Sequence, residues 1–362
     1  MAFPVIDLSG PARQRGLTHG RALRERIHEN LAVYFARFER EAGLERREVL
    51  DRAARYERAL ADQAPDYAAA MRGVAEGAGC ELVEIAALNA RYELLYHRWG
   101  EQLLVDGCTA FAVLPARSAT GALLAGQNWD WLPGVRGAIV RVRRDDRDNG
   151  PDSVAFTEAG IVGAKIGFNS AGITLGVNGM MSVGDDWSRL RRPFHVRCDD
   201  VLAAATFDDA VRAVADEPRN CSANFAISGL PDRAVSLETA PDRLNHLTAD
   251  DSGCVVHSNH FVDPAAIGVI EPPNERRPHS YFRRARLGEL IASSPRVSIA
   301  DLQGWLADHH GSPEGLCRHG LPGESMDERI VTVTAAIIEP AARCMHITDG
   351  PPCTSAWQTV TL

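Results

Sequence analysis

The chain has 362 residues, of which 45% are hydrophobic and 24% charged, a composition typical of globular proteins with a sizeable core. It carries 39 Lys and Arg against 48 Asp and Glu, a formal net charge of −9, so no global positive field favours nucleic acid as a partner. Disorder, collagen-like structure and a small disulfide scaffold are excluded, and the single lysine, Lys165, leaves little room for Schiff-base chemistry.

The N-terminus and the cysteines bear on compartment and metal content. The opening residues MAFPVIDLSG have neither a basic segment nor an apolar segment of a secretory signal, and no apolar run approaches the ~18 residues that span a bilayer. We therefore expect a cytoplasmic protein without membrane contact. The eight cysteines lie far apart, with no CxxC motif and no His/Cys pair at zinc-site spacing. We expect no metal, and we interpret most cysteines as small buried hydrophobic residues.

Residues 13–98 have helical periodicity. Leu23, Ile27, Leu31 and Tyr34 recur at spacings of three and four and form one apolar stripe. Because this region has no clear alternation of β-branched residues, we expect the first hundred residues to be all-helical.

The pattern changes after Gly107-Cys108. Residues 109–115 and 122–131, joined by a turn that contains Gly121, are typical of a β-hairpin. Further strands are expected at 138–144, 153–159, 164–170, 172–178, 222–228, 234–240, 244–249, 253–259, 330–339 and 344–350, and helices at 199–217, 280–293 and 299–310. Runs of strands and runs of helices without regular βαβ alternation predict an α+β fold built of layers.

Cys108 is placed unusually for a core cysteine, because it follows Gly107 and opens a strand. A nucleophilic cysteine needs a nearby base, and a cysteine at a chain N-terminus has one in its own α-amino group, whose pKa of about 8 suits neutral pH. Cys108 would reach that position only if the chain were cut. Gly107 favours such a cut, since glycine tolerates the strain and close approach that attack of the thiol on the preceding carbonyl requires.

Several segments carry a family resemblance. DGCTAFAVLP, GALLAGQNWDW, FTEAGIVGAKIGFNSAGIT and VVHSNH resemble the acyl-CoA:6-aminopenicillanic acid acyltransferase family (peptidase C45) of N-terminal nucleophile (Ntn) hydrolases. The resemblance implies a four-layer αββα sandwich with a mainly helical N-terminal region and no cofactor. It also implies an inactive precursor, or zymogen, that cuts itself between Gly107 and Cys108. The products would be a helical chain 1–107 and a chain 108–362, which stay together as one integrated domain.

The resemblance also implies roles for individual residues. Cys108 corresponds to the nucleophile, Asp130 to the acidic residue that positions it, and Asn259 to the oxyanion-hole asparagine. For the family's late arginine, Arg329 is the better match and Arg318 is the rival. Substrate contacts are expected from Thr109, whose backbone N–H is a second oxyanion donor, and from Gln127, Asn128 and Trp129.

These assignments predict an amidase that cleaves an N-acyl amide or amino-acid amide through a Cys108 thioester. The alternative is acyl transfer from a donor such as acyl-CoA to an amine such as a β-lactam nucleus. Expected partners are a small-molecule substrate, the two chains of one precursor and possible further copies of the protein. Alternatives of other classes are a Cys-His dyad that uses His257 or His260, a metal-dependent hydrolase, and an inactive binding protein on the same fold.

Overall fold

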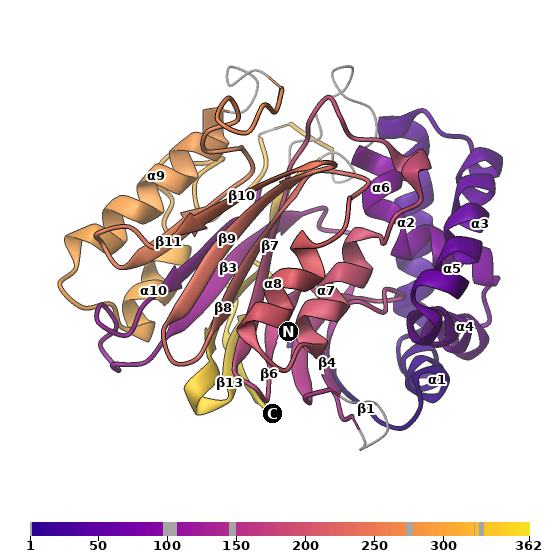
Figure 1. The fold of residues 1–362 in the computed structure, drawn as a ribbon, viewed down its shortest axis with the longest axis horizontal. Helices are drawn as coiled ribbons and strands as arrows, with labels where there is room; N and C mark the ends of the chain where they lie inside the picture. Colours follow the sequence, from indigo (N-terminus) through magenta and orange to yellow (C-terminus); the bar gives the residue numbers. More distant parts are fainter. Residues whose placement is uncertain (1, 97–106, 145–149, 273–277, 322, 326–328) are drawn as a thin grey trace.

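The computed structural model describes residues 2–96, 107–144, 150–272, 278–321, 323–325 and 329–362. Two packed β-sheets form the centre of the molecule, and helices cover both outer faces (Figure 1). The expected α+β sandwich of four layers, with a helical N-terminal region, is therefore confirmed.

The larger sheet has eight strands in the order β1-β4-β5-β6-β7-β8-β9-β10. All neighbours are antiparallel except β1 and β4, which are parallel. The strands are β1 (Val5–Leu8), β4 (Gly137–Val142), β5 (Ser153–Glu158), β6 (Ile166–Asn169), β7 (Ile173–Gly179), β8 (Ala223–Gly229), β9 (Arg233–Ala240) and β10 (Arg243–Thr248).

The smaller sheet has six strands in the order β11-β2-β3-β12-β13-β14, all antiparallel to their neighbours. They are β2 (Thr109–Val113), β3 (Leu124–Trp131), β11 (Cys254–His257), β12 (Val331–Glu339), β13 (Cys344–Thr348) and β14 (Trp357–Thr361). β2 and β3 form the expected hairpin, and Gly121 in its turn has φ +70°, a backbone conformation that favours glycine.

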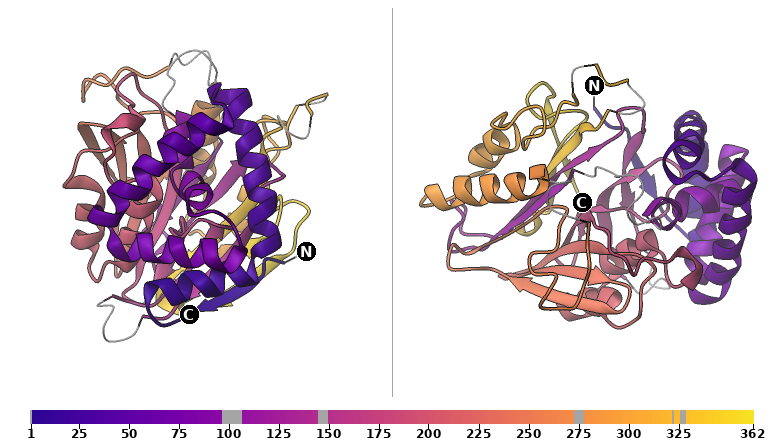
Figure 2. Two further views of the ribbon diagram at one scale, coloured as in Figure 1. Left: turned by 90° about the vertical axis from the view of Figure 1, so that its right-hand side faces the viewer. Right: turned by 90° about the horizontal axis from the view of Figure 1, so that it is seen from above.

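Four helices form the outer layers. α7 (Phe194–Ala203) and α8 (Phe207–Ala215) pack on the larger sheet, and α9 (Pro278–Ser293) and α10 (Ile299–Leu306) pack on the smaller one (Figure 2). The prediction of one helix over 199–217 is wrong. The helix is interrupted between Ala203 and Phe207. Thr206 caps the start of α8 as a separate helix, because its hydroxyl accepts a hydrogen bond from Asp209 N at 3.1 Å.

The N-terminal region forms a block of helices beside the sheets (Figure 1). It contains α1 (Ala12–Ala22), α2 (Arg24–Ala42), α3 (Arg46–Gln63), α4 (Pro65–Ala78), α5 (Leu82–Asn89) and α6 (Arg91–Tyr96), and the end of the expected helical region, 97–98, lies outside the described residues. The expectation that the first hundred residues are all-helical is wrong at β1. This strand joins the larger sheet beside β4, with Val5 opposite Ile139, so part of the N-terminal region belongs to the sandwich.

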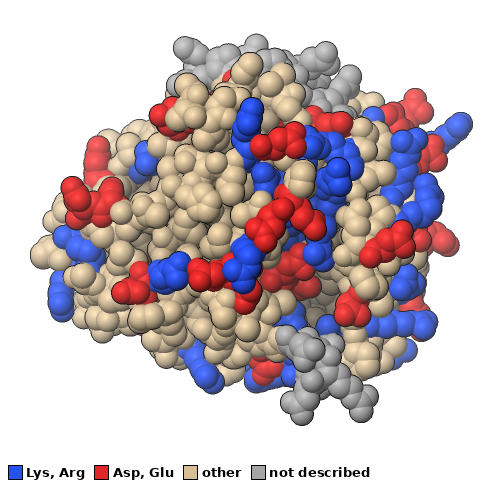
Figure 3. All heavy atoms as spheres, viewed as in Figure 1, with Lys and Arg blue, Asp and Glu red and all other residues tan. Residues whose placement is uncertain are grey.

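Residues of both sheets and of the N-terminal helices share one large hydrophobic core. On the face drawn in Figure 3, acidic and basic side chains are interleaved. Ion pairs join exposed groups such as Arg233 and Asp208, and the half-buried Arg189 pairs with the exposed Asp242. Within the described residues, no helix combines the length and the apolar character needed to cross a bilayer.

Candidate active site

Cys108 lies directly before β2, at the end of a strand that has β11 on one side and β3 on the other. Thr109 pairs with Asn128 on β3, and Ala110 pairs with His257 on β11. This register brings the ends of three strands to one point. It explains why motifs that lie as far apart in sequence as QNWDW and VVHSNH meet beside Cys108.

Asn259 contacts Cys108 directly. The Cys108 backbone N–H donates to Asn259 Oδ1 at 2.9 Å, and Asn259 Nδ2 donates to Gly179 O at 2.9 Å. Arg283 on α9 donates from Nη2 to the same Asn259 oxygen at 2.8 Å and from Nε to Thr109 Oγ1 at 3.2 Å. These three hydrogen bonds of the amide fix its orientation. Arg283 is fully buried and was missed from the sequence, where it belongs to an ordinary arginine-rich helix.

Asp130 lies on the other side of the cleavage site predicted between Gly107 and Cys108. Its Oδ1 accepts from Thr332 Oγ1 at 2.6 Å. A methyl group placed on Gly107 would lie 2.7 Å from Asp130 Oδ2 and 2.7 Å from Arg318 Nη1, closer than real side chains allow. Gly107 lies outside the left-handed backbone region, so close approach to these two charged groups, rather than its φ angle, favours glycine here.

The structure places Arg318, rather than Arg329, beside Asp130. The Arg318 backbone N–H donates to Thr332 Oγ1 at 2.8 Å, and Thr332 N donates to Arg318 O at 3.0 Å. Arg329 packs on the loop around Gly320 and donates from Nη2 to Glu324 O at 3.2 Å. Arg318 therefore lies close to Asp130 and Gly107, whereas Arg329, the better match by sequence, contacts a different loop.

Two of the expected substrate contacts have partners inside the fold. Gln127 bridges the two sheets, because Nε2 donates to Val177 O at 3.2 Å and Oε1 accepts from Val177 N at 2.6 Å. Asn128 Nδ2 donates to the carbonyls of Leu306 and Leu316, at 2.8 and 2.7 Å, and so ties β3 to the end of α10 and the following loop. Both side chains are fully buried, and these contacts stabilise the scaffold of the site.

Trp129 has a more open position. It lines a cavity of about 450 Å³ together with Phe3, Phe156 and Thr332. Thr332 links this cavity to the site around Cys108, because its hydroxyl donates to Asp130. Its other walls include Glu25 and further residues of α2 and of the loop after β3. The cavity has the size and mixed lining of a small-molecule site.

A buried cluster of charges lies next to Trp129. Lys165 pairs with Glu158, and its Nζ lies 3.4 Å from the centre of the Trp129 ring. Arg91 and Tyr34 contact the same carboxylate. Burial lowers the pKa of Lys165 to about 8, and Glu158 partly offsets that effect. Lys165 also interacts electrostatically with Cys108, which like Glu158 opposes the effect of burial on the Lys165 pKa.

The two histidines around Asn259 have other partners. His257 Nε2 lies 2.9 Å from Glu238 Oε1, and His260 Nδ1 lies 2.8 Å from Ser280 Oγ. The His260 ring also stacks on Tyr281, with 3.7 Å between ring centres. These contacts do not favour the Cys-His dyad considered from the sequence.

Comparisons with known proteins agree with the motifs. Residues 117–352 match the family profile of acyl-coenzyme A:6-aminopenicillanic acid acyl-transferase. The 40 kDa form of acyl-coenzyme A:6-aminopenicillanic-acid-acyltransferase from Emericella nidulans is 28% identical over 280 residues, which are 76% of this chain and 74% of the relative. Among solved structures, a Caenorhabditis elegans ortholog of N-acylethanolamine-hydrolyzing acid amidase has a TM-score of 0.46 and 16% identity, covering 70% of this chain and 100% of that one. Penicillin V acylase from Agrobacterium tumefaciens has a TM-score of 0.45 and 13% identity, covering 70% and 86%.

Proposed function

Since the chain belongs to the acyl-coenzyme A:6-aminopenicillanic acid acyltransferase family and is an enzyme of the amide hydrolase and acyltransferase type, we propose that Cys108 is its nucleophile. We further propose that the chain is made as a zymogen and activates itself by cleavage before Cys108. The observation that carries the proposal is the convergence of Asn259, Asp130 and Arg318 on the two residues Gly107 and Cys108.

In the activation step, the Cys108 thiol attacks the carbonyl carbon of Gly107. A thioester forms, the peptide C–N bond breaks, and the thiol proton passes to the nitrogen that becomes the Cys108 α-amino group. Water then hydrolyses the thioester, which leaves a carboxylate on Gly107 and restores the thiol. Asp130 and Arg318 lie together beside Gly107, where they can orient the peptide bond that is cut.

In turnover, the new α-amino group takes the proton of Cys108 as the sulfur attacks the substrate amide. The amine leaves with that proton, and the acyl group remains on sulfur as a thioester. An amide N–H of Asn259 and the backbone N–H of Thr109 would stabilise the negative oxygen of the tetrahedral intermediate. The cavity beside Trp129 is the candidate substrate site.

Water or an amine can accept the acyl group from the thioester. We propose hydrolysis of an N-acyl amide or amino-acid amide as the main reaction, because transfer needs a second site that excludes water. The name of the Emericella nidulans relative favours the second candidate, transfer from acyl-CoA to 6-aminopenicillanic acid. Assays with and without that amine, which measure the free acid and the new amide separately, distinguish the two.

The proposal is tested by the intact mass of denatured, freshly purified protein. Wild type is expected to give two species of roughly 12 and 27 kDa, scaled by residue fraction, with the smaller ending at Gly107. Cys108→Ala is expected to remain one 39.3 kDa chain without activity. Asp130→Asn is expected to fold and to process slowly, because it keeps the shape of the carboxylate and loses its charge. An active Cys108→Ala protein would exclude Cys108 as the nucleophile.

A further inference from the structure

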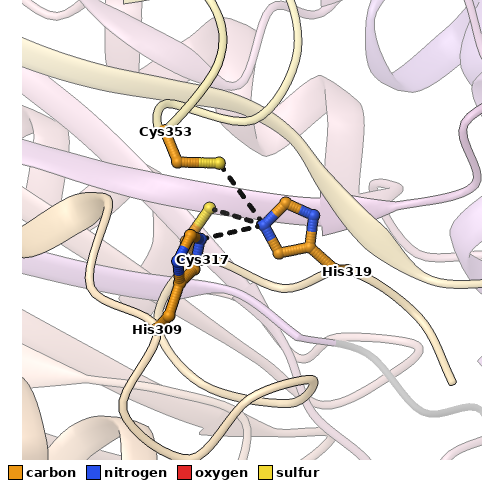
Figure 4. A group of neighbouring side chains, drawn as sticks. All are labelled: His309, Cys317, His319 and Cys353. Carbon is orange, nitrogen blue, oxygen red and sulfur yellow. Dashed lines mark hydrogen bonds between the residues drawn. The ribbon is translucent and has the colours of Figure 1, made fainter.

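Four potential metal ligands from separate parts of the chain meet near the end of α10. His309 follows α10, Cys317 and His319 belong to the loop that leads to β12, and Cys353 comes from the loop between β13 and β14 (Figure 4). One ligand atom of each lies within 4.8 Å of the other three. Cys317 is buried, Cys353 and His319 are half-buried, and His309 is exposed, so the cluster lies at the protein surface with one accessible side.

The distances from His319 to the other three ligands match a tetrahedral metal site. His319 Nε2 lies 3.0 Å from His309 Nε2, 3.4 Å from Cys317 Sγ and 3.4 Å from Cys353 Sγ. Zinc bonds of ~2.0–2.1 Å to nitrogen and ~2.3 Å to sulfur put ligand atoms about 3.3–3.8 Å apart along the edges of a tetrahedron. The three pairs that include His319 Nε2 therefore need shifts of only a few tenths of an ångström to bind Zn²⁺, and the other three pairs lie within 4.8 Å.

Hydrogen bonds alone do not explain this arrangement. The Nε2 atom of a histidine carries either one proton or one lone pair, so it makes one in-plane hydrogen bond. His319 Nε2 has three contacts of that length, and two of them are to thiols, which are weak hydrogen-bond donors and acceptors. A cation at the centre would give each of the four atoms the partner that its lone pair needs.

Backbone hydrogen bonds hold the ligands in place. Cys317 N donates to Asp308 O at 3.0 Å, and His319 N donates to Pro313 O at 3.0 Å. On the other loop, Gly350 N donates to Val333 O at 3.0 Å, and Thr354 N donates to Pro351 O at 3.1 Å. Both loops are thus fixed independently of any contact within the cluster, as a preformed site requires.

We propose that the protein binds one Zn²⁺ through His309 Nε2, Cys317 Sγ, His319 Nε2 and Cys353 Sγ. Binding releases the two thiol protons and leaves both histidines neutral. Four protein ligands complete the tetrahedron, so the zinc is structural and has no open position for substrate or water. The sequence expectation of no metal rested on spacing, and it missed ligands separated by one, seven and 33 residues in two loops.

The site would also fix part of the candidate active site. Arg318 lies between the ligands Cys317 and His319, and its backbone binds Thr332, the partner of Asp130. Zinc would therefore anchor the loop that presents Arg318 to Gly107. The zinc site itself does not depend on the proposed catalytic function.

The test uses the whole protein under reducing conditions. The protein is stripped of metal with a chelator and reloaded with one equivalent of Zn²⁺ or Co²⁺, and the bound metal is then measured. We expect mass spectrometry of the metal to find one Zn²⁺ per chain. A competing chelator whose own dissociation constant for Zn²⁺ is about micromolar should not remove it. The Co²⁺ form should show thiolate-to-cobalt charge transfer and the visible bands of a tetrahedral ion. Cys353→Ser and His309→Ala should each lower the affinity at least about 100-fold, the upper range for losing a ligand's supporting hydrogen bond. His309 is exposed, so its variant keeps the test valid if Cys353→Ser misfolds.

A second group of ligand types provides the matched control. Glu339, Cys344 and His346 also lie within 4.8 Å of one another, on β12 and β13. Cys344→Ser should keep one Zn²⁺ and the same Co²⁺ spectrum. The proposal is overturned if zinc binds only weakly, if His309→Ala binds it like wild type, or if Cys344→Ser abolishes binding.

Discussion

At the scale of single residues, the site depends on how close charged side chains come to Gly107. Asp130 and Arg318 occupy the space where any side chain at position 107 would lie. A methyl group on residue 107 would force one or both of these side chains to shift. The glycine of the DGC motif thus serves the neighbouring side chains as much as the backbone.

The two late arginines give a direct comparison. Arg318→Gln is expected to slow self-cleavage and turnover by about 10²-fold or more, because the positive charge beside Gly107 and Asp130 is lost. Arg329→Gln, whose Nη2 binds Glu324 O, is expected to change either rate by less than about threefold. Rates of precursor loss by gel densitometry, together with circular dichroism of both variants, check the prediction. Equal effects of the two substitutions would contradict the geometric choice of Arg318.

At the scale of elements, α1 and α4 cross at unusually close range. Gly16 on α1 and Gly73 on α4 each face the backbone of the other helix. A methyl group on Gly73 would lie 2.1 Å from Arg13 O, and one on Gly16 would lie 2.0 Å from Ala70 O. Gly20 and Gly77 repeat the contact one turn further on. The glycines, four residues apart on each helix, let the two backbones touch.

Gly73→Ala is therefore expected to lower the free energy of unfolding by at least about 2 kcal/mol, because the helices must separate. Gly304→Ala, within α10, is the control, since nothing lies within 4 Å of the added methyl group. That substitution should be neutral or stabilising by up to about 1 kcal/mol through helix propensity. Urea unfolding of both variants measures the difference, and a neutral Gly73→Ala would mean that the helices do not cross this closely.

Local patterns were sufficient for some elements and not for others. The β2–β3 hairpin and the helices α9 and α10 follow from periodicity and turn residues, and the motifs around Cys108, Asp130 and Asn259 point to one place. The pairing of β1 with β4 joins residues more than 130 positions apart, and a four-residue strand carries no signal of it. Arg318, Arg283 and the partners of Asn128 are likewise set by tertiary packing, which one sequence does not encode locally.

At the scale of the whole molecule, the N-terminal helices hold the sheets through polar contacts to one turn. Asn30 Nδ2 donates to Ala159 O at 2.9 Å, and Asn89 Nδ2 donates to Gly160 O at 2.9 Å. His19 Nε2 accepts from Gly160 N at 3.0 Å. Together with β1, these bonds explain how a cleaved N-terminal chain would remain attached to the rest. They also make the association sensitive to acid, because His19 must stay neutral to accept.

That sensitivity can be predicted with its sign. Burial lowers the pKa of His19 from 6.5 to about 4, so between these pH values the unfolded chain binds more protons than the folded one. Stability contributed by neutral His19 is complete above pH 6.5 and is lost as the pH falls toward 4, by about 3 kcal/mol at ~1.4 kcal/mol per pH unit.

His19→Gln, whose amide oxygen can still accept from Gly160 N, is expected to flatten this part of the stability profile. Urea unfolding of wild type and variant at a series of pH values from 7 to 4 measures the effect. His246→Gln, at an exposed position on β10, should leave the wild-type slope unchanged. If His19→Gln loses as much stability in acid as wild type does, protonation of this histidine does not control the attachment of the N-terminal helices.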